Sequence, residues 1–282
     1  MLNKRKILRR IYYKIPPNLR FVFRKVYFFP HDIWSSMWRN RNKYEPLKGD
    51  IFVGSGDFIA QGIHHLELLK THIFLEPENK VLDIGSGIGR TAVALTKFLN
   101  SEGKYEGFDV VEKGVKWCND KIKKENPNFN FIYVPLNNDL YNNNKVKASI
   151  FKFPYDDNSF DKVFLFSVFT HMLPDEITNY LSEIKRVLKP GGLCLSTFFI
   201  YNTKNEDKTI NNGQFSFPFD KGNYRLMSDE VKSANIALKE NFLEKIILDA
   251  GLRRLKTIEG FWKIDIKNQN CNDFQDIIIM EA

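Results

Sequence analysis

From residue 50 onward, short apolar runs alternate with longer segments whose apolar residues recur at helical spacing. This alternation predicts an α/β fold, with a mostly parallel sheet and helices on both of its faces. The expected strands are residues 81–84, 105–109, 131–134, 161–166, 193–199, 256–264 and 275–281, and the expected helices are 64–71, 90–99, 112–125, 176–188 and 239–250. Residues 202–225 are polar and rich in Gly and Asn, so we expect an irregular insertion there.

The first 49 residues follow another pattern, in which apolar stripes lie among basic residues. One stripe runs from Ile7 to Ile15, and the prolines that follow it end that helix. A second stripe repeats at i, i+3, i+4, i+7 and i+8, and it consists of Leu19, Val22, Phe23, Val26 and Tyr27. We therefore divide the chain into a basic amphipathic helical arm, residues 1–49, and an α/β domain, residues 50–282.

Charge is distributed unevenly between these two parts. The whole chain has a net charge of +8, but residues 1–49 contain 13 Lys and Arg against two Asp and Glu. The remaining 29 basic and 32 acidic residues give the domain a net charge of −3. A domain without excess positive charge makes nucleic acid an improbable partner. Basic amphipathic helices with aromatic residues are typical of membrane interfaces, so residues 1–45 are predicted to contact an anionic membrane. The alternatives, which do not exclude membrane contact, are that the stripes pack on the domain while the charges are simply solvated, or that they form a surface for a partner.

The rest of the composition is that of a globular protein, with 43% apolar and 27% charged residues. No apolar run reaches the length of about 18 residues that a spanning helix needs. Cys118, Cys194 and Cys271 match neither a disulfide framework nor a zinc spacing, and the five histidines show no metal-ligand periodicity. We therefore expect a cytoplasmic protein without a bound metal, associated with the membrane through its arm.

The most specific signal is the segment Val-Leu-Asp-Ile-Gly-Ser-Gly-Ile-Gly-Arg at residues 81–90. It joins a buried strand through a glycine turn to a helix, which creates an edge where backbone N–H groups can approach a nucleotide. A dinucleotide fingerprint has the spacing G-x-G-x-x-G, whereas this turn has G-x-G-x-G with Asp83 before it. A carboxylate beside the turn would repel a pyrophosphate but suits a cationic amino-acid group.

This segment resembles motif I of the class I S-adenosylmethionine-dependent methyltransferases. The resemblance continues, in the same order, through Gly-Phe-Asp-Val at 107–110, Phe-Pro-Tyr-Asp-Asp-Asn-Ser-Phe-Asp at 153–161, Ser-Val-Phe-Thr-His-Met-Leu at 167–173 and Arg-Val-Leu-Lys-Pro-Gly-Gly at 186–192. It implies a Rossmann-like, seven-stranded, mostly parallel sheet whose last strand is antiparallel. It also implies that S-adenosylmethionine is the cofactor and that the protein is a methyltransferase.

The resemblance also implies roles for particular residues. Asp83 would hold the ammonium group of the cofactor, and the glycine turn would hold its methionine part. Asp109, at the end of the second strand, would accept hydrogen bonds from the ribose hydroxyls. Ser149 and Ile150 stand where relatives carry an Asp-Ala pair that meets the adenine, so the Ser departs from the pattern. The complete predicted cofactor site is Asp83, Gly85, Ser86, Gly87, Gly89, Arg90, Phe108, Asp109, Val110, Ser149, Ile150 and Ser167.

His171 follows the fourth expected strand, at the sheet edge where ligands gather. Its ordinary pKa makes it a candidate general base near neutral pH. The alternative is that it holds a loop by hydrogen bonding to the backbone. Methyl transfer from a sulfonium requires chiefly in-line positioning, so a base is not essential to it.

The acceptor is the least determined part of the prediction. No Asn/Asp-Pro-Pro-Tyr/Phe sequence for amino groups and no pair of reactive cysteines for base carbons is present. O-methylation of a small molecule, a glycan or a glycolipid is the leading hypothesis. The alternatives are a nicotinamide-dependent oxidoreductase and a non-catalytic module that binds S-adenosylmethionine.

Overall fold

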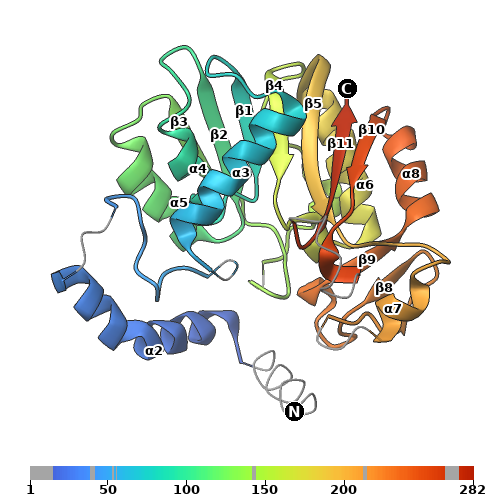
Figure 1. Ribbon diagram of the computed structural model, residues 1–282, viewed down its shortest axis with the longest axis horizontal. Coiled ribbons are helices and arrows are strands. Elements are labelled where there is room, and N and C mark those ends of the chain that lie inside the picture. Colours follow the sequence, from blue (N-terminus) through green and yellow to red (C-terminus); the bar gives the residue numbers. More distant parts are fainter. Residues whose placement is uncertain are drawn as a thin grey trace.

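The computed structural model describes residues 15–38, 42–52, 54, 56–141, 144–211, 215–263 and 273–282. Its centre is a seven-stranded sheet with the order β10-β11-β5-β4-β1-β2-β3 (Figure 1). Parallel pairing joins the strands from β5 to β3, and β11 lies antiparallel between β5 and β10. The predicted fold class is therefore confirmed. The strands are β1 Lys80–Ile84, β2 Lys104–Asp109, β3 Phe129–Tyr133, β4 Phe160–Leu165, β5 Leu188–Phe198, β10 Arg253–Ile258 and β11 Asp276–Glu281.

Helices cover both faces of the sheet (Figure 1). On one face, α3 (Phe58–Ile73), α4 (Arg90–Leu95) and α5 (Glu112–Cys118) bury their apolar side chains with those of β1 and β2. On the other face, α6 (Pro174–Val187) and α8 (Glu240–Asp249) bury theirs with β4 and β5. The alternation of strands and helices in the sequence follows from this layering, because each element has to bury one apolar stripe.

Two predicted helices are shorter than expected. The helix expected at 90–99 ends at Leu95, where the N–H of Phe98 bonds to the carbonyl of Leu95 and tightens the turn. The helix expected at 112–125 changes after Cys118 into a π-helix, Asn119–Lys123. Helical periodicity in the sequence persists through both changes, so it could not mark them.

The prediction of an irregular insertion at 202–225 is wrong. This region forms α7 (Glu206–Asn211), β7 (Phe219–Asp220) and β8 (Tyr224–Leu226), and a small sheet with the order β6-β9-β8-β7. The other two strands of this sheet are β6 (Ile200–Tyr201) and β9 (Ile236–Lys239). The buried side chain of Arg225 organises the region, because it donates to the Phe217 carbonyl and pairs with Glu206 and Asp220. A charged side chain in the interior of a polar segment leaves no periodic signal in the sequence.

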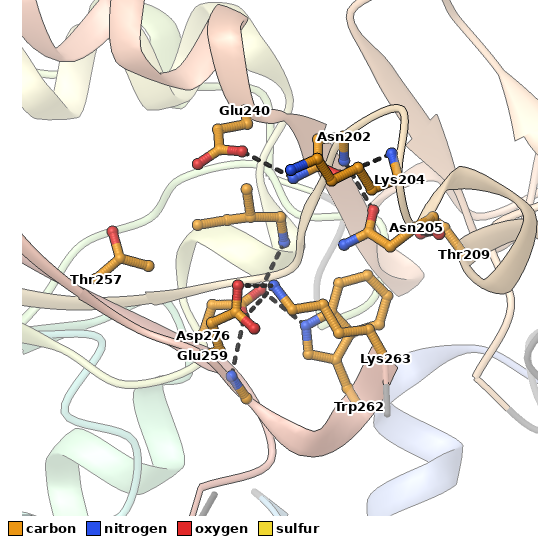
Figure 2. Close-up of polar contacts among 12 residues, drawn as sticks. Asn202, Lys204, Asn205, Thr209, Glu240, Thr257, Glu259, Trp262, Lys263 and Asp276 are labelled. Carbon is orange, nitrogen blue, oxygen red and sulfur yellow. Dashed lines mark hydrogen bonds and ion pairs between the residues drawn. The ribbon is translucent and has the colours of Figure 1, made fainter. Parts of the chain in front are cut away.

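A buried carboxylate joins this small sheet to the main sheet (Figure 2). Asp276, at the start of β11, has no exposed surface and accepts from the backbone N–H groups of Ile200 and Gly260, each at 2.8 Å. It also accepts from the Trp262 indole at 2.8 Å and from the Lys263 ammonium at 2.9 Å. These four bonds of Asp276 fix the position at which β11 starts, and therefore also the position of the residues just before Asp276.

The described part of the arm is one long helix, α2 (Pro17–Trp38), which lies beyond the carboxyl ends of the parallel strands (Figure 1). Its apolar stripe is exposed, from 48% at Leu19 to 78% at Tyr27. The alternative in which this stripe packs on the domain is therefore wrong. The first stripe, residues 7–15, lies outside the described residues except at its end. None of the described helices combines the length and the apolar character that crossing a membrane requires.

Candidate active site

One cavity of about 480 Å³ lies at the carboxyl ends of β1, β2 and β4. Ligands of open α/β sheets bind at this edge. Ten of the residues predicted from the sequence line the cavity, namely Asp83, Gly85, Ser86, Gly87, Arg90, Phe108, Asp109, Val110, Ser167 and His171. The folded chain thus brings together nearly all of the predicted cofactor residues and the predicted base.

The glycine turn after β1 is held against the end of β2. The N–H groups of Gly85 and Ser86 both donate to the carbonyl of Phe108, at 2.9 and 3.1 Å. Gly85 has φ +78°, and a Cβ at this position would lie 2.4 Å from a methyl carbon of Val168, so only glycine fits. The Ser86 hydroxyl is buried beside the cavity and has no hydrogen-bond partner among the described residues. An orphaned hydroxyl on a ligand cavity fits a polar ligand group.

Asp83 is a buried carboxylate on the cavity wall, with one partner in the hydroxyl of Tyr105 at 2.6 Å. The pKa of Asp83 is raised to about 7. Burial is the main cause and the charge of Asp109 adds to it, while the hydrogen bond from Tyr105 acts in the opposite direction. A carboxylate in this setting gains the most from a cationic ligand, because a positive charge offsets the cost of its burial. The site therefore fits the ammonium group of an amino acid.

Asp109 ends β2 and is also buried. Its two oxygens accept from the N–H of Gly87 at 2.8 Å and from the N–H of Val111 at 2.7 Å. Burial raises the pKa of Asp109 to about 6, and these backbone hydrogen bonds lower it. The Val110 N–H also bonds to this carboxylate, which has about four lone-pair sites, so Asp109 can still accept from a ribose hydroxyl while it holds the glycine turn. This geometry fits a ribose.

Arg90 is the first residue of α4 and lies against Gly54. Burial lowers its pKa to about 10, and its guanidinium packs so closely against Gly54 that a Cβ there would lie 2.6 Å from Nη1. Next to it, His65 contacts the Thr91 hydroxyl through Nδ1 at 2.8 Å and stacks on Phe166 with ring centroids 3.8 Å apart. Burial lowers the pKa of His65 to about 3, so it stays neutral. No spacing in the sequence pointed to His65 as part of this cavity.

Three predicted cofactor residues do not line the cavity. Gly89 is the N-cap residue of α4, with φ +77°, and a Cβ there would meet Ile122 and Cys118, so it serves helix packing. Ser149 and Ile150 lie in a short 3₁₀ turn, Ala148–Ile150, and only Ala148 of that turn lines the cavity. Ile150 is 76% exposed. In a turn of three residues the side chains point in three directions, so counting along the sequence could not identify the inward one.

His171 lies in the wall of the cavity, in the 3₁₀ turn Phe169–His171. Its Nδ1 lies 2.8 Å from the carbonyl oxygen of Ser233. Because a carbonyl oxygen only accepts, this bond assigns the hydrogen to Nδ1 and leaves Nε2 as the acceptor. Burial lowers the pKa of His171, which keeps the ring neutral. The predicted base and its loop-holding alternative are therefore compatible in one residue.

Aromatic residues from distant segments complete the cavity, and the sequence analysis missed them. They are Phe52, Tyr141, Phe166, Tyr180, Phe215 and Phe274. Gln275 also lines the cavity and accepts from the Ser167 hydroxyl at 2.9 Å. Apart from Tyr180 of α6, these residues come from loops and from the insertion, where an isolated aromatic residue carries no periodic signal. They give the cavity an apolar part beside its polar turn.

Comparison with known proteins identifies the type of domain. A profile for the family "Methyltransferase domain" matches residues 82–196, from β1 to β5. The match covers the part of the Rossmann-like sheet that contains the glycine turn and the cavity, and it supports S-adenosylmethionine as the cofactor.

The curated relatives are similar over part of the chain. The ubiquinone/menaquinone biosynthesis C-methyltransferase UbiE of Wigglesworthia glossinidia brevipalpis is 29% identical over 141 residues, 49% of this chain and 51% of that protein. The sterol 24-C-methyltransferase erg6 of Schizosaccharomyces pombe is 28% identical over 139 residues, 49% of this chain and 32% of that protein. The chain thus spans about half of the length of the first relative and about a third of the second.

Among solved structures, the PH0226 protein of Pyrococcus horikoshii has a similar fold. It matches with a TM-score of 0.54 over 83% of this chain and 94% of its own, at 16% sequence identity. At this identity the similarity supports the fold and not the substrate.

Proposed function

We propose that the protein transfers the methyl group of S-adenosylmethionine to oxygen of a small molecule, a glycan or a glycolipid. One observation carries this proposal. The same cavity is lined by Asp83 and Asp109 beside the glycine turn, by the neutral His171 and by a set of aromatic side chains. The polar turn suits the cofactor, and the aromatic side chains suit an apolar part of the acceptor. A glycolipid combines such an apolar part with hydroxyl groups.

When bound, the cofactor would supply an electrophilic methyl group on a sulfonium. The residues of this chain would hold and orient it, with Asp83 on the ammonium, Asp109 on the ribose and the Ser86 hydroxyl on a polar group. His171 would accept the hydroxyl proton of the acceptor at Nε2, because its Nδ1 hydrogen is held by the Ser233 carbonyl. The aromatic wall would exclude water and fix the acceptor in line.

A second candidate is transfer to carbon, which the names of the relatives favour. UbiE and the sterol enzyme are both C-methyltransferases, and their names refer to quinones and a sterol, which are lipids. The same Nε2 of His171 could take a proton from an activated carbon. Both candidates use the same cavity and the same histidine, and the difference lies in the atom that is methylated.

The experiment follows the methyl group into a product. Purified protein is incubated with methyl-labelled S-adenosylmethionine and a fractionated cell extract, and the labelled product is analysed by NMR. A methoxy signal supports O-methylation, and a new C–CH₃ signal establishes the second candidate. Binding of S-adenosylhomocysteine without label in any fraction would indicate a non-catalytic module.

Calorimetry addresses the remaining alternative. S-adenosylhomocysteine and NAD are titrated side by side into the same protein. We expect binding of S-adenosylhomocysteine alone, because the G-x-G-x-G spacing and Asp83 disfavour a pyrophosphate. Tight binding of NAD alone would instead establish the oxidoreductase.

We also propose, from the charge of the arm, that residues 1–45 contact an anionic membrane surface. Exposure of the α2 stripe supports this part of the proposal.

A further inference from the structure

Helix α2 carries most of its large apolar side chains outward and buries the polar side chains of Arg20, Asp32 and Ser35. The outward side chains are between 45% and 78% exposed, and we call them the outward face: Leu19, Val22, Phe23, Val26, Tyr27, Phe29, Ile33, Trp34, Met37 and Trp38. At 100° per residue they all lie on one side of the helix. An apolar surface of this size on a globular protein marks a site of interaction.

The opposite face of α2 is already occupied by the domain. Asp32 is buried and accepts from the N–H groups of Lys48 and Gly49, each at 2.9 Å. Arg20 is buried and donates to the carbonyl of Leu140 at 2.9 Å. Phe21 packs edge-on against Phe52, with ring centroids 5.6 Å apart. Specific polar bonds thus fix the helix with its apolar side away from the protein.

We propose that the outward face of α2 docks into the interface of an anionic lipid bilayer and holds the cavity at the membrane surface. The arm has 13 basic residues against two acidic ones, while the rest of the chain has a net charge of −3. Only the arm therefore complements an anionic surface. Trp and Tyr side chains favour the headgroup level of a bilayer, and the outward face contains Tyr27, Trp34 and Trp38. The inward bonds of Arg20 and Asp32 keep the helix on the surface instead of across it.

The docked helix contacts segments that line the cavity. Phe52, the partner of Phe21, is a lining residue, and so is Tyr141, which follows the Arg20 acceptor Leu140. Figure 1 shows α2 on the side of the molecule to which the parallel strands point. Docking would therefore bring the cavity close to lipids in the bilayer. This step, from docking to a lipid acceptor, rests on the proposed methyl transfer; docking itself rests only on the charge of the arm and the outward face of α2.

The test measures binding of the full-length protein to vesicles. Vesicles of equimolar phosphatidylglycerol and phosphatidylcholine are compared with vesicles of phosphatidylcholine alone, by co-sedimentation. We expect binding to the anionic vesicles and much weaker binding to the neutral ones. The double variant Phe23→Ala and Trp34→Ala should lose between about tenfold and a hundredfold of its partition coefficient, because two large apolar side chains are removed. Alanine keeps the helix intact.

The matched control is Leu248→Ala on α8, since Leu248 and Trp34 are both 58% exposed. It should bind vesicles like the unmodified protein. Trp34→Phe should retain most of the binding. Lipids brominated near the headgroup should quench tryptophan fluorescence in the unmodified protein, and the double variant should lose that quenching. Circular dichroism and S-adenosylhomocysteine titration of each variant show that it is folded.

Several outcomes would overturn the proposal. One is equal sedimentation of the unmodified protein and the double variant; another is an equal loss in Leu248→Ala. A third is a dimer in solution that the double variant converts to a monomer without any vesicle binding, because the face would then belong to a second copy. Vesicle binding without S-adenosylhomocysteine binding would remove the proposed function and leave the docking surface in place.

Discussion

Two buried carboxylates, Asp83 and Asp109, are the residues on which cofactor binding depends most. Burial raises the pKa of both, to about 7 and about 6. A carboxylate that burial destabilises and that lies on the wall of a cavity is typical of a ligand site. Each carboxylate should become more acidic when a complementary group binds to it, which makes its role measurable.

The first prediction concerns pH. If Asp83 binds the ammonium group, the bound cation lowers the pKa of Asp83 from about 7. Fewer protons are then bound in the complex than in the free protein, so the affinity for S-adenosylhomocysteine should rise as pH increases towards 7 and level off above it. Calorimetry in two buffers of different ionisation enthalpy should detect proton release at pH 6. Asp83→Asn should bind weakly and release fewer protons, because only Asp109 then becomes more acidic on binding, and proton uptake on binding would contradict the assignment.

The second prediction concerns the ribose. Asp109→Ala removes the acceptor for the ribose hydroxyls and also leaves the buried N–H groups of Gly87 and Val111 without their partner. We expect S-adenosylhomocysteine binding to weaken by about 1.5–3 kcal/mol, the scale of hydrogen bonds to a charged group. Titration calorimetry measures it. Asp109→Asn keeps one acceptor oxygen and should lose less, and an unchanged affinity in Asp109→Ala would place the ribose elsewhere.

At the scale of elements, the buried pair of Asp276 and Lys263 joins the two sheets. Asp276→Asn removes one charge and leaves the Lys263 ammonium buried beside a neutral group. Unfolding in urea should show a loss of about 3–5 kcal/mol.

The double variant Asp276→Asn and Lys263→Met is the matched comparison. It removes both charges, so its loss should be smaller than the sum of the two single losses. Additive losses would show that the pair is not coupled.

The sequence predicted the elements of the main sheet well, because a buried parallel strand such as Val81–Ile84 is an apolar run with clear ends. It could not predict the small sheet. Tyr224–Leu226 is short, and it is held by the bonds of Arg225 to residues up to 19 positions away. Pairing that depends on one buried guanidinium has no periodic pattern. The positions of Phe215 and Gln275 on the cavity wall were also not predicted, because a single residue outside the regular elements gives no periodic pattern.

For the whole molecule, the stripe in the arm was predicted correctly, but its direction was not determined. Amphipathic periodicity indicates that one face of a helix is apolar, but it does not indicate what that face contacts. The direction is set by Arg20 and Asp32, which are polar residues that the domain binds. The described part of the molecule has an exposed apolar face on α2, and the arm to which α2 belongs has a net charge of +11 against −3 for the rest of the chain.

This separation of charge leads to the last prediction, that vesicle binding has two components with different salt dependence. Attraction between the arm and anionic lipid is screened as the Debye length falls from about 10 Å at 0.1 M salt to about 3 Å at 1 M. Burial of Phe23, Trp34 and their neighbours is not screened. Raising the salt concentration should therefore weaken binding to phosphatidylglycerol vesicles down to a plateau, which equals the weak binding to neutral vesicles. In the Phe23→Ala and Trp34→Ala variant the plateau should vanish while the slope against salt stays the same. A plateau that survives in this variant would mean that the apolar contact lies outside α2.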